Sequence, residues 1–298
     1  MPVKRLGELD FGALGADAEV VSNNKQKRSI FDAAFVVPPG IDVNQYRRGE
    51  LYFVTGRKGT GKTALLRYLH SHFDQKTTYS HFVVYRDDIK TREKEDIFKS
   101  AGIVVNKHPD LDPGTIEVVD GWLIYMFREL TRLLERHSDA VTSKAALRTF
   151  LDATAGIRGL KPQKSWSDRM FRRGASVRVA GVAEFKLNRD ITKDAGGPDR
   201  AIDQIRLFFD LLAHLKFKPD HKFFLLFDEL HFVVTKGDRN ERDTILVRDL
   251  IQATERFNRN CIEHHLPIHV LCAIRSEVID SVFGASHELR KAAQSYGR

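Results

Sequence analysis

The sequence has only two cysteines, Cys261 and Cys272, and no long apolar run. Two cysteines are too few for a disulfide framework, which indicates a reducing compartment. No uncharged apolar stretch approaches the roughly 18 residues that a membrane helix needs. Lys4 and Arg5 are followed by no apolar segment of the signal-peptide type. We therefore expect a cytoplasmic protein without a membrane-spanning segment.

The composition is that of a globular protein with a modest basic excess. Its 298 residues are 42% hydrophobic and 30% charged, so the chain can bury a full core. The formal charge of +8 favours an acidic partner such as nucleic acid. Residues 155–194 hold ten Lys or Arg against four Asp or Glu, interleaved with Trp166, Phe171 and Phe185. This segment is a candidate for nucleic-acid binding, with a protein effector or a solvated face as alternatives.

Apolar runs alternate with helix-like periodicity along the chain. Strands are predicted at residues 51–55, 81–89, 222–231 and 268–277, and helices at 62–73, 115–137, about 202–215 and 242–262. Residues 175–187 alternate as one strand or as a hairpin turning near Gly181. This order predicts an α/β protein of three layers, α/β/α, around a mainly parallel sheet.

A glycine-rich turn joins the first strand to the helix that follows it. Residues 56–63, "GRKGTGKT", match the G-x-x-x-x-G-K-[ST] pattern of the P-loop, or Walker A motif, in full. Lys62 would reach the β- and γ-phosphates of ATP, and the Thr63 hydroxyl would bind Mg²⁺. The residues predicted to hold the nucleotide are Gly56, Arg57, Lys58, Gly59, Thr60, Gly61, Lys62, Thr63 and Ala64.

Two acids end the apolar run "FFLLFDE", the candidate Walker B motif. Asp228 is predicted to hold Mg²⁺ through the ion's water shell, and Glu229 to orient and deprotonate the attacking water. An acid directly after the strand-terminal Asp indicates an ATPase with a catalytic glutamate rather than a kinase or a small GTPase. The expected reaction is hydrolysis of ATP to ADP and phosphate.

On the stretches "GRKGTGKT", "LLFDE" and "HVLCAIRSE", the chain resembles the P-loop ATPases of the additional-strand catalytic-glutamate division. Within it, the resemblance is to the AAA+-like group that includes origin-recognition-type and KAP-type proteins. It implies that Arg275, or Ser276 beside it, senses the γ-phosphate, and that Arg290 is a candidate arginine finger for a neighbour in a homo-oligomer. It also implies a switching or remodelling role that is linked to DNA or to bacterial antiviral defence.

The sequence departs from that group in two places. The predicted organisation is an N-terminal arm of residues 1–45 and an ATPase domain of residues 46–298. Lys62 and Asp228 are so far apart in the sequence that residues at about 104–197 are predicted to be an insertion in this domain. The chain also ends soon after Arg275, so the helical lid of such ATPases is either absent or lost from a fragment.

Four other functions compete with this one. A nucleotide-gated scaffold for a separate effector would bind ATP with little turnover, and "DELH", residues 228–231, also fits a DExH helicase-like fragment. A small-molecule kinase would need an acceptor pocket. A zinc site is less favoured than buried cysteines and surface histidines, although the spacing invites one. Its ligands would come from Cys261, His264, His265, His269 and Cys272.

Overall fold

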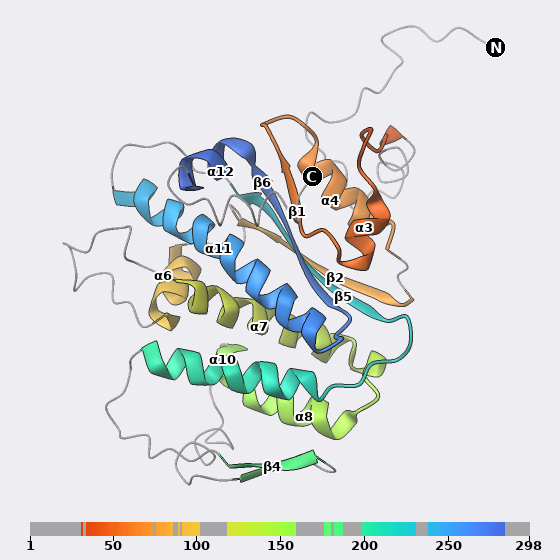
Figure 1. Cartoon of the computed structure of the whole chain (residues 1–298), viewed down its shortest axis with the longest axis vertical. Helices are drawn as coiled ribbons and strands as arrows, with labels where there is room; N and C mark the ends of the chain where they lie inside the picture. The colour runs from red at the N-terminus through yellow and green to blue at the C-terminus, as the bar shows by residue number, and fades with distance from the viewer. Residues whose placement is uncertain are drawn as a thin grey trace, which may run out of the picture.

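A four-stranded parallel sheet is the centre of the molecule (Figure 1). The computed structural model describes residues 31, 34–73, 76–85, 89, 91–101, 118–158, 176–179, 182–186, 198–230 and 238–283. The sheet has the order β1-β6-β5-β2, and each neighbouring pair is parallel. Its strands are β1 (Phe53–Gly56), β2 (Thr78–Val84), β5 (Lys222–Leu230) and β6 (Ile268–Arg275). The predicted parallel α/β class is confirmed.

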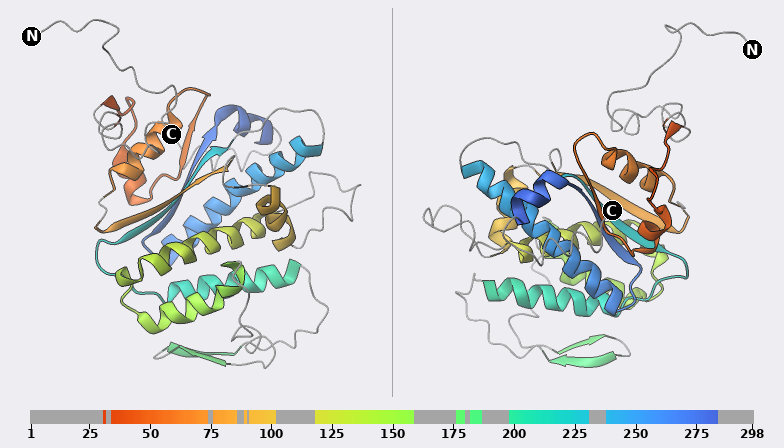
Figure 2. Two further views of the ribbon diagram at one scale, coloured as in Figure 1. Left: turned by 180° about the vertical axis from the view of Figure 1, so that it is seen from behind. Right: turned by 45° about the horizontal axis from the view of Figure 1, so that its top comes forward.

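Helices cover both faces of this sheet (Figure 2). On one face lie α3 (Val43–Arg48) and α4 (Lys62–Ser71), and on the other lie α7 (Val119–Arg136) and α11 (Asp238–Glu263). This arrangement is compatible with the predicted three layers. The remaining helical elements are α6 (Thr91–Ser100), η4 (Ser138–Ala140), α8 (Lys144–Ala153), η5 (Ala155–Arg158), α10 (Pro198–Ala213) and α12 (Ser276–Phe283).

Phenylalanine rings connect α7 to three other helices. Phe127 of α7 is fully buried, and its ring centroid lies 4.8 Å from that of Phe209 in α10, 5.4 Å from that of Phe257 in α11 and 6.5 Å from that of Phe150 in α8. The helix α10 packs on α7, and α8 packs on α10, so these two helices add a further layer outside the sheet (Figure 1). Of this layer, α8 falls within the region predicted to be an insertion, and α10 begins just after it.

Residues 175–187 include an antiparallel pair, β3 (Ser176–Val179) and β4 (Val182–Lys186). Of the two alternatives for this stretch, the described backbone therefore agrees with the hairpin. Most of the predicted nucleic-acid segment, and residues 1–30 of the predicted arm, lie outside the described residues. Within the described part of the chain, no helix combines the length and apolarity that crossing a membrane requires.

His269 is buried at the start of β6 against the end of α3. Its ring centroid lies 5.0 Å from that of Phe224, and a Cβ on Gly49 would come within 2.1 Å of its Nδ1 atom. Gly49 also has φ +74°, which favours glycine, so the close contact and the left-handed turn require the same residue. Burial, assisted by the charge of Lys222, lowers the pKa of His269 to about 4.

We expect His269 to make the protein less stable in mild acid. The unfolded chain binds a proton near pH 6.5, whereas folded His269 resists it down to about pH 4. The free energy of unfolding should therefore be unaffected above pH 6.5 and fall by about 3 kcal/mol as the pH drops through this window. Urea denaturation across the window measures this loss, and His269→Gln should remove it.

Exposed His264 provides the control, because His264→Gln should keep the wild-type pH dependence. Equal pH dependence in His269→Gln and wild type would contradict the assignment.

Candidate phosphate-binding site

The glycine-rich turn joins β1 to α4 as an open loop. Gly59 and Gly61 both have φ +85°, and a Cβ added to either would meet no atom within 4 Å among the described residues. Thr60 closes the turn, because its hydroxyl and its backbone N–H both donate to the carbonyl of Arg57, at 2.9 and 3.3 Å. The glycines therefore provide a left-handed backbone with free space beside it, which suits the close approach of an anion.

The helix that follows begins without a carboxylate. Gly61 is the N-cap of α4 and provides no side-chain hydrogen bond, and the first turn contains no acidic residue. The partial positive charge at this helix end is therefore available to an external anion. Thr63 and Ala64 are half-buried in this first turn, and Arg57 and Lys58 of the loop are exposed.

Lys62 folds back over the loop. Its ammonium group donates to the carbonyls of Gly56 and Arg57, at 2.9 and 2.7 Å. Burial and the charge of Arg275 lower its pKa, while the carboxylates of Glu277 and Asp228 act in the opposite sense. The described structure thus brings Lys62 within electrostatic reach of one basic and two acidic groups from distant parts of the sequence.

Regular alternation would place Asp228 on the face of the sheet that carries α4, and its electrostatic effect on Lys62 agrees with that side. Phe227 of β5 packs on the opposite face, 6.2 Å from Trp122 of α7, and side chains alternate along a strand. Phe224 has the same orientation as Asp228 and stacks on Phe73, just beyond α4, at 4.4 Å. Asp228 is 2% exposed, and a charge buried to this extent requires compensating interactions. Its carboxylate lies within electrostatic reach of Lys62, at the end of the sheet that carries the loop.

A β-bulge coincides with the two acids of β5. Phe227 pairs with Cys272 of β6, but Leu230 pairs with Ile274, so β5 has one extra residue between these pairs. Bulges turn side chains out of the regular alternation and are frequent beside active sites. The backbone of Glu229 lies within this bulge, whereas its side chain lies outside the described residues.

The strand β6 brings Arg275 to the loop. Gly56 and Arg275 are register partners in the β1-β6 pair, and both are at the carboxyl ends of their strands. The strand lies between β1 and β5, so the loop, Arg275 and Asp228 all meet at one edge of the sheet. Ser276 is the first residue of α12, directly after Arg275.

Sequence reasoning missed a further residue at this edge, Glu277. The backbone N–H groups of Glu277 itself and of Lys58 in the loop, together with the charges of Lys62 and Arg275, lower the pKa of its carboxylate, while desolvation opposes them. A negative charge therefore lies beside a loop N–H of the kind that P-loops offer to phosphate. Its position two residues after Arg275 was the available signal in the sequence.

The residues of this edge fit ATP and Mg²⁺. The loop offers N–H groups to the phosphates, and Lys62 offers a cation. The carboxylate of buried Asp228 and the hydroxyl of Thr63 are oxygen ligands, the type that Mg²⁺ prefers. Arg290, the candidate arginine finger, lies outside the described residues.

The described residues contain no group of three or more His, Cys, Asp or Glu side chains that could hold a metal ion. Cys261 and Cys272 are buried and His264 and His265 are exposed, as expected from the sequence. The prediction was wrong for His269, which is buried because it packs under α3.

Comparison of the chain with protein-family models, with curated proteins and with solved structures found no match in any of the three.

Proposed function

We propose that this protein is a Mg²⁺-dependent ATPase that couples hydrolysis to a conformational switch or remodelling step. The observation that carries the proposal is the meeting of the Lys62 loop, Asp228 and Arg275 at one edge of a parallel sheet. The strand order adds support. The additional-strand division takes its name from a strand between the phosphate-loop strand and the acid strand, and β6 has this position.

Each residue has a chemical role in this proposal. Lys62 and the loop N–H groups offset the charge of the β- and γ-phosphates. Thr63 and Asp228 would hold Mg²⁺, which neutralises charge that develops on the phosphate oxygens. Glu229 orients the attacking water and accepts its proton, and Arg275 contacts the γ-phosphate. The loss of that phosphate after hydrolysis changes the contacts of Arg275, and this change starts the conformational switch.

The partners and location in this proposal rest on the sequence. The partners are a nucleic acid or an effector protein at the basic segment of residues 155–194, and further copies of the chain in a homo-oligomer. The location is the cytoplasm. A role in antiviral defence follows from the resemblance alone. The second candidate function is a nucleotide-gated scaffold with little turnover. It is favoured by the contact of Glu277 with the loop, which opposes easy entry of nucleotide.

Two substitutions should change the affinity for ATP in opposite directions. Lys62→Ala should weaken ATP binding by about tenfold or more, because it removes a charge-assisted contact to phosphate. Glu277→Gln should tighten it by about threefold, because it removes an exposed negative charge beside the loop. Isothermal titration calorimetry with ATP and Mg²⁺ measures both. Lys218→Ala is the control, because this exposed lysine precedes the amino end of β5. Failure of the wild type to bind ATP, or equal binding by Lys62→Ala, would refute the proposed site.

A further inference from the structure

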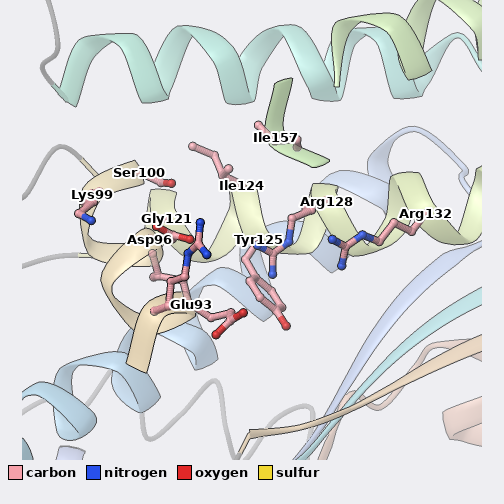
Figure 3. A pocket seen from close by; sticks show the side chains of 12 residues that line it. Glu93, Asp96, Lys99, Ser100, Gly121, Ile124, Tyr125, Arg128, Arg132 and Ile157 are labelled. Carbon is pink, nitrogen blue, oxygen red and sulfur yellow. The ribbon is translucent and has the colours of Figure 1, made fainter. Parts of the chain in front are cut away.

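A cavity of about 490 Å³ lies between α6 and α7 (Figure 3), and α7 covers the face of the sheet opposite α4. The two helices touch beside it through Gly121, where a Cβ would come within 2.1 Å of the Ile97 carbonyl. We call this cavity the α6-α7 pocket. It is lined by Arg92, Glu93, Asp96, Ile97, Lys99, Ser100, Gly121, Ile124, Tyr125, Arg128, Arg132 and Ile157.

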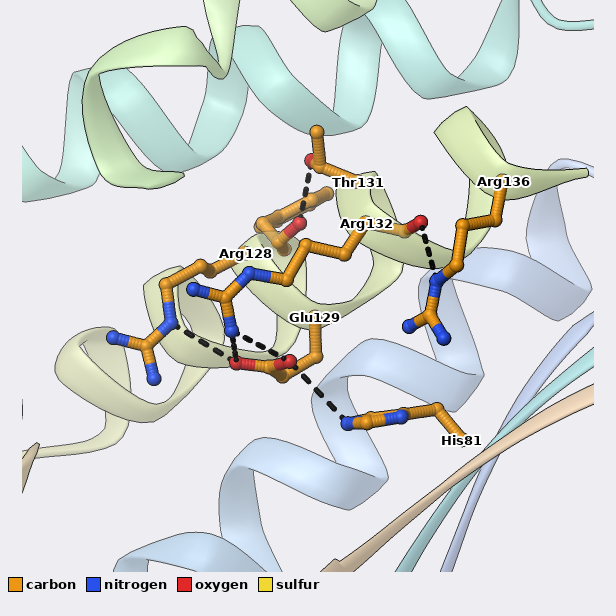
Figure 4. A network of polar contacts seen from close by, with 7 residues as sticks. His81, Arg128, Glu129, Thr131, Arg132 and Arg136 are labelled. Atoms are coloured by element: carbon orange, nitrogen blue, oxygen red, sulfur yellow. Dashed lines mark hydrogen bonds and ion pairs between the residues drawn. The ribbon is translucent and has the colours of Figure 1, made fainter. Parts of the chain in front are cut away.

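A buried carboxylate holds two arginines at this pocket (Figure 4). Glu129 has a side chain 3% exposed, and it accepts from Arg128 Nε at 3.0 Å and from an Arg132 terminal nitrogen at 2.8 Å. Burial opposes its charge, but the hydrogen bond from His81 and the charges of Arg132 and Arg128 outweigh it and lower its pKa to about 2. Glu129 therefore stays ionised near neutral pH and keeps both guanidinium groups in place.

Each guanidinium group keeps donors beyond those that Glu129 uses. Arg128 contacts Glu129 through Nε, and no further hydrogen bond from Arg128 is made among the described residues. Its guanidinium carbon lies 4.4 Å from the centroid of the Tyr125 ring, which fixes the plane of the group. The side chains of Arg128 and Arg132 are 18% and 43% exposed. Two fixed and accessible guanidinium groups on one helix suit a phosphate group.

The α6 wall of the pocket offers a hydrogen-bond acceptor, whereas the arginines of α7 offer donors. The Oε2 atom of Glu93 is buried and has no hydrogen-bond partner among the described residues. Figure 3 shows its carboxylate directed toward Tyr125, across from the arginines. A buried acceptor without a donor is costly, so a ligand that brings an N–H group to Glu93 would gain from it.

We propose that the α6-α7 pocket binds one nucleotide unit, with its phosphate on Arg128 and Arg132 and an N–H group of its base on Glu93. The volume lies in the range of small-ligand sites. The planar guanidinium of Arg128 offers a surface on which a base can stack. The same chemistry is presented by a free mononucleotide and by one residue of a single-stranded nucleic acid. The proposal does not depend on the phosphate loop, none of whose residues lines this pocket.

The test is a set of titrations with the full chain at low salt. The probes are the four nucleoside 5′-monophosphates, by calorimetry, and fluorescent single-stranded DNA and RNA of about eight nucleotides, by anisotropy. Each is repeated with Lys62→Ala, so that binding at the phosphate loop is recognised. Wild type and Lys62→Ala should bind at least one probe equally.

Substitutions in the pocket should then weaken this binding. Arg128→Gln should do so by about tenfold, and Arg128→Lys by less, because lysine keeps the charge without the planar group. Arg136→Gln is the matched control, since Arg136 lies on the same helix, donates to the Arg132 carbonyl and does not line the pocket (Figure 4). Ser100→Trp fills the pocket without touching the Glu129 network, so it serves if Arg128→Gln does not fold.

The possible results distinguish a free nucleotide from a nucleic acid as the ligand. Binding of monophosphates alone identifies a free nucleotide, and tighter, salt-dependent binding of oligonucleotides identifies a nucleic-acid residue. The proposal is overturned if no probe binds, if Lys62→Ala abolishes all binding, or if neither Arg128→Gln nor Ser100→Trp weakens it. Loss of ATP affinity in Lys62→Ala with unchanged probe binding would support both sites independently.

Discussion

Glu229→Gln is expected to lower the rate of ATP hydrolysis by roughly 10²- to 10⁴-fold, the usual contribution of a general base. Glutamine has nearly the same shape as glutamate but cannot accept the proton of the attacking water. The residue lies in the bulge of β5 beside buried Asp228, which is the proposed position of the metal. ATP binding should persist, because the loop and Lys62 are unchanged, so the variant should retain ATP that the wild type converts to ADP.

The measurement is steady-state phosphate release over a range of protein concentrations, with and without duplex DNA, together with ATP affinity. Glu263→Gln, at the exposed end of α11, is the control for loss of a carboxylate elsewhere. Turnover that requires Glu229 and rises with DNA or concentration would support a DNA-linked, oligomeric ATPase. Equal turnover in both variants would exclude Glu229 as the base. Tight ATP binding with near-zero turnover in the wild type would favour the nucleotide-gated scaffold.

Phe127→Ala is expected to reduce the free energy of unfolding by about 3 to 5 kcal/mol. The ring is fully buried, and its neighbours Phe150, Phe209 and Phe257 come from three different helices. Truncation would leave a cavity that no single helix can close, because each is also held by the others. Urea denaturation, followed by tryptophan fluorescence and by circular dichroism, measures the loss.

Val36→Ala is the control for the Phe127 substitution. Val36 is 81% exposed, so its truncation should change stability by less than about 0.5 kcal/mol. Because the Phe127 cluster joins α8 and α10 to α11, both probes should report one cooperative transition. A separate transition for the outer helices, or a loss below about 1 kcal/mol in Phe127→Ala, would contradict this packing.

Local patterns in the sequence predicted the elements well. The apolar run around Phe224 and the helical period of α7 each depend on neighbouring residues, which is why both were found from spacing alone. Boundaries were less accurate. The strand predicted at 81–89 is β2, Thr78–Val84, because its polar first half, including His81, is paired with β5 at the edge of the sheet. Helices α6 and α8 were not predicted.

Part of the candidate site could likewise be found from the sequence, and part could not. The loop could be found from the sequence because glycine spacing determines its backbone locally, as the left-handed Gly59 and Gly61 illustrate. The contact between Glu277 and Lys58 could not be found, because it depends on the register of β1 against β6. The bulge at Asp228 and Glu229 likewise exists only relative to β6.

The sequence by itself determined the parallel α/β class, the glycine-rich loop and the two acids at the end of a buried strand. Only the tertiary structure decided that β6 lies between β1 and β5, that His269 is buried under Gly49, and that Glu129 holds Arg128 and Arg132 at the α6-α7 pocket. The physical reason is the distance along the chain over which each interaction acts. Backbone conformation and periodicity are set within a few residues, whereas strand order, desolvation and ion pairing depend on groups that meet only after the chain has folded.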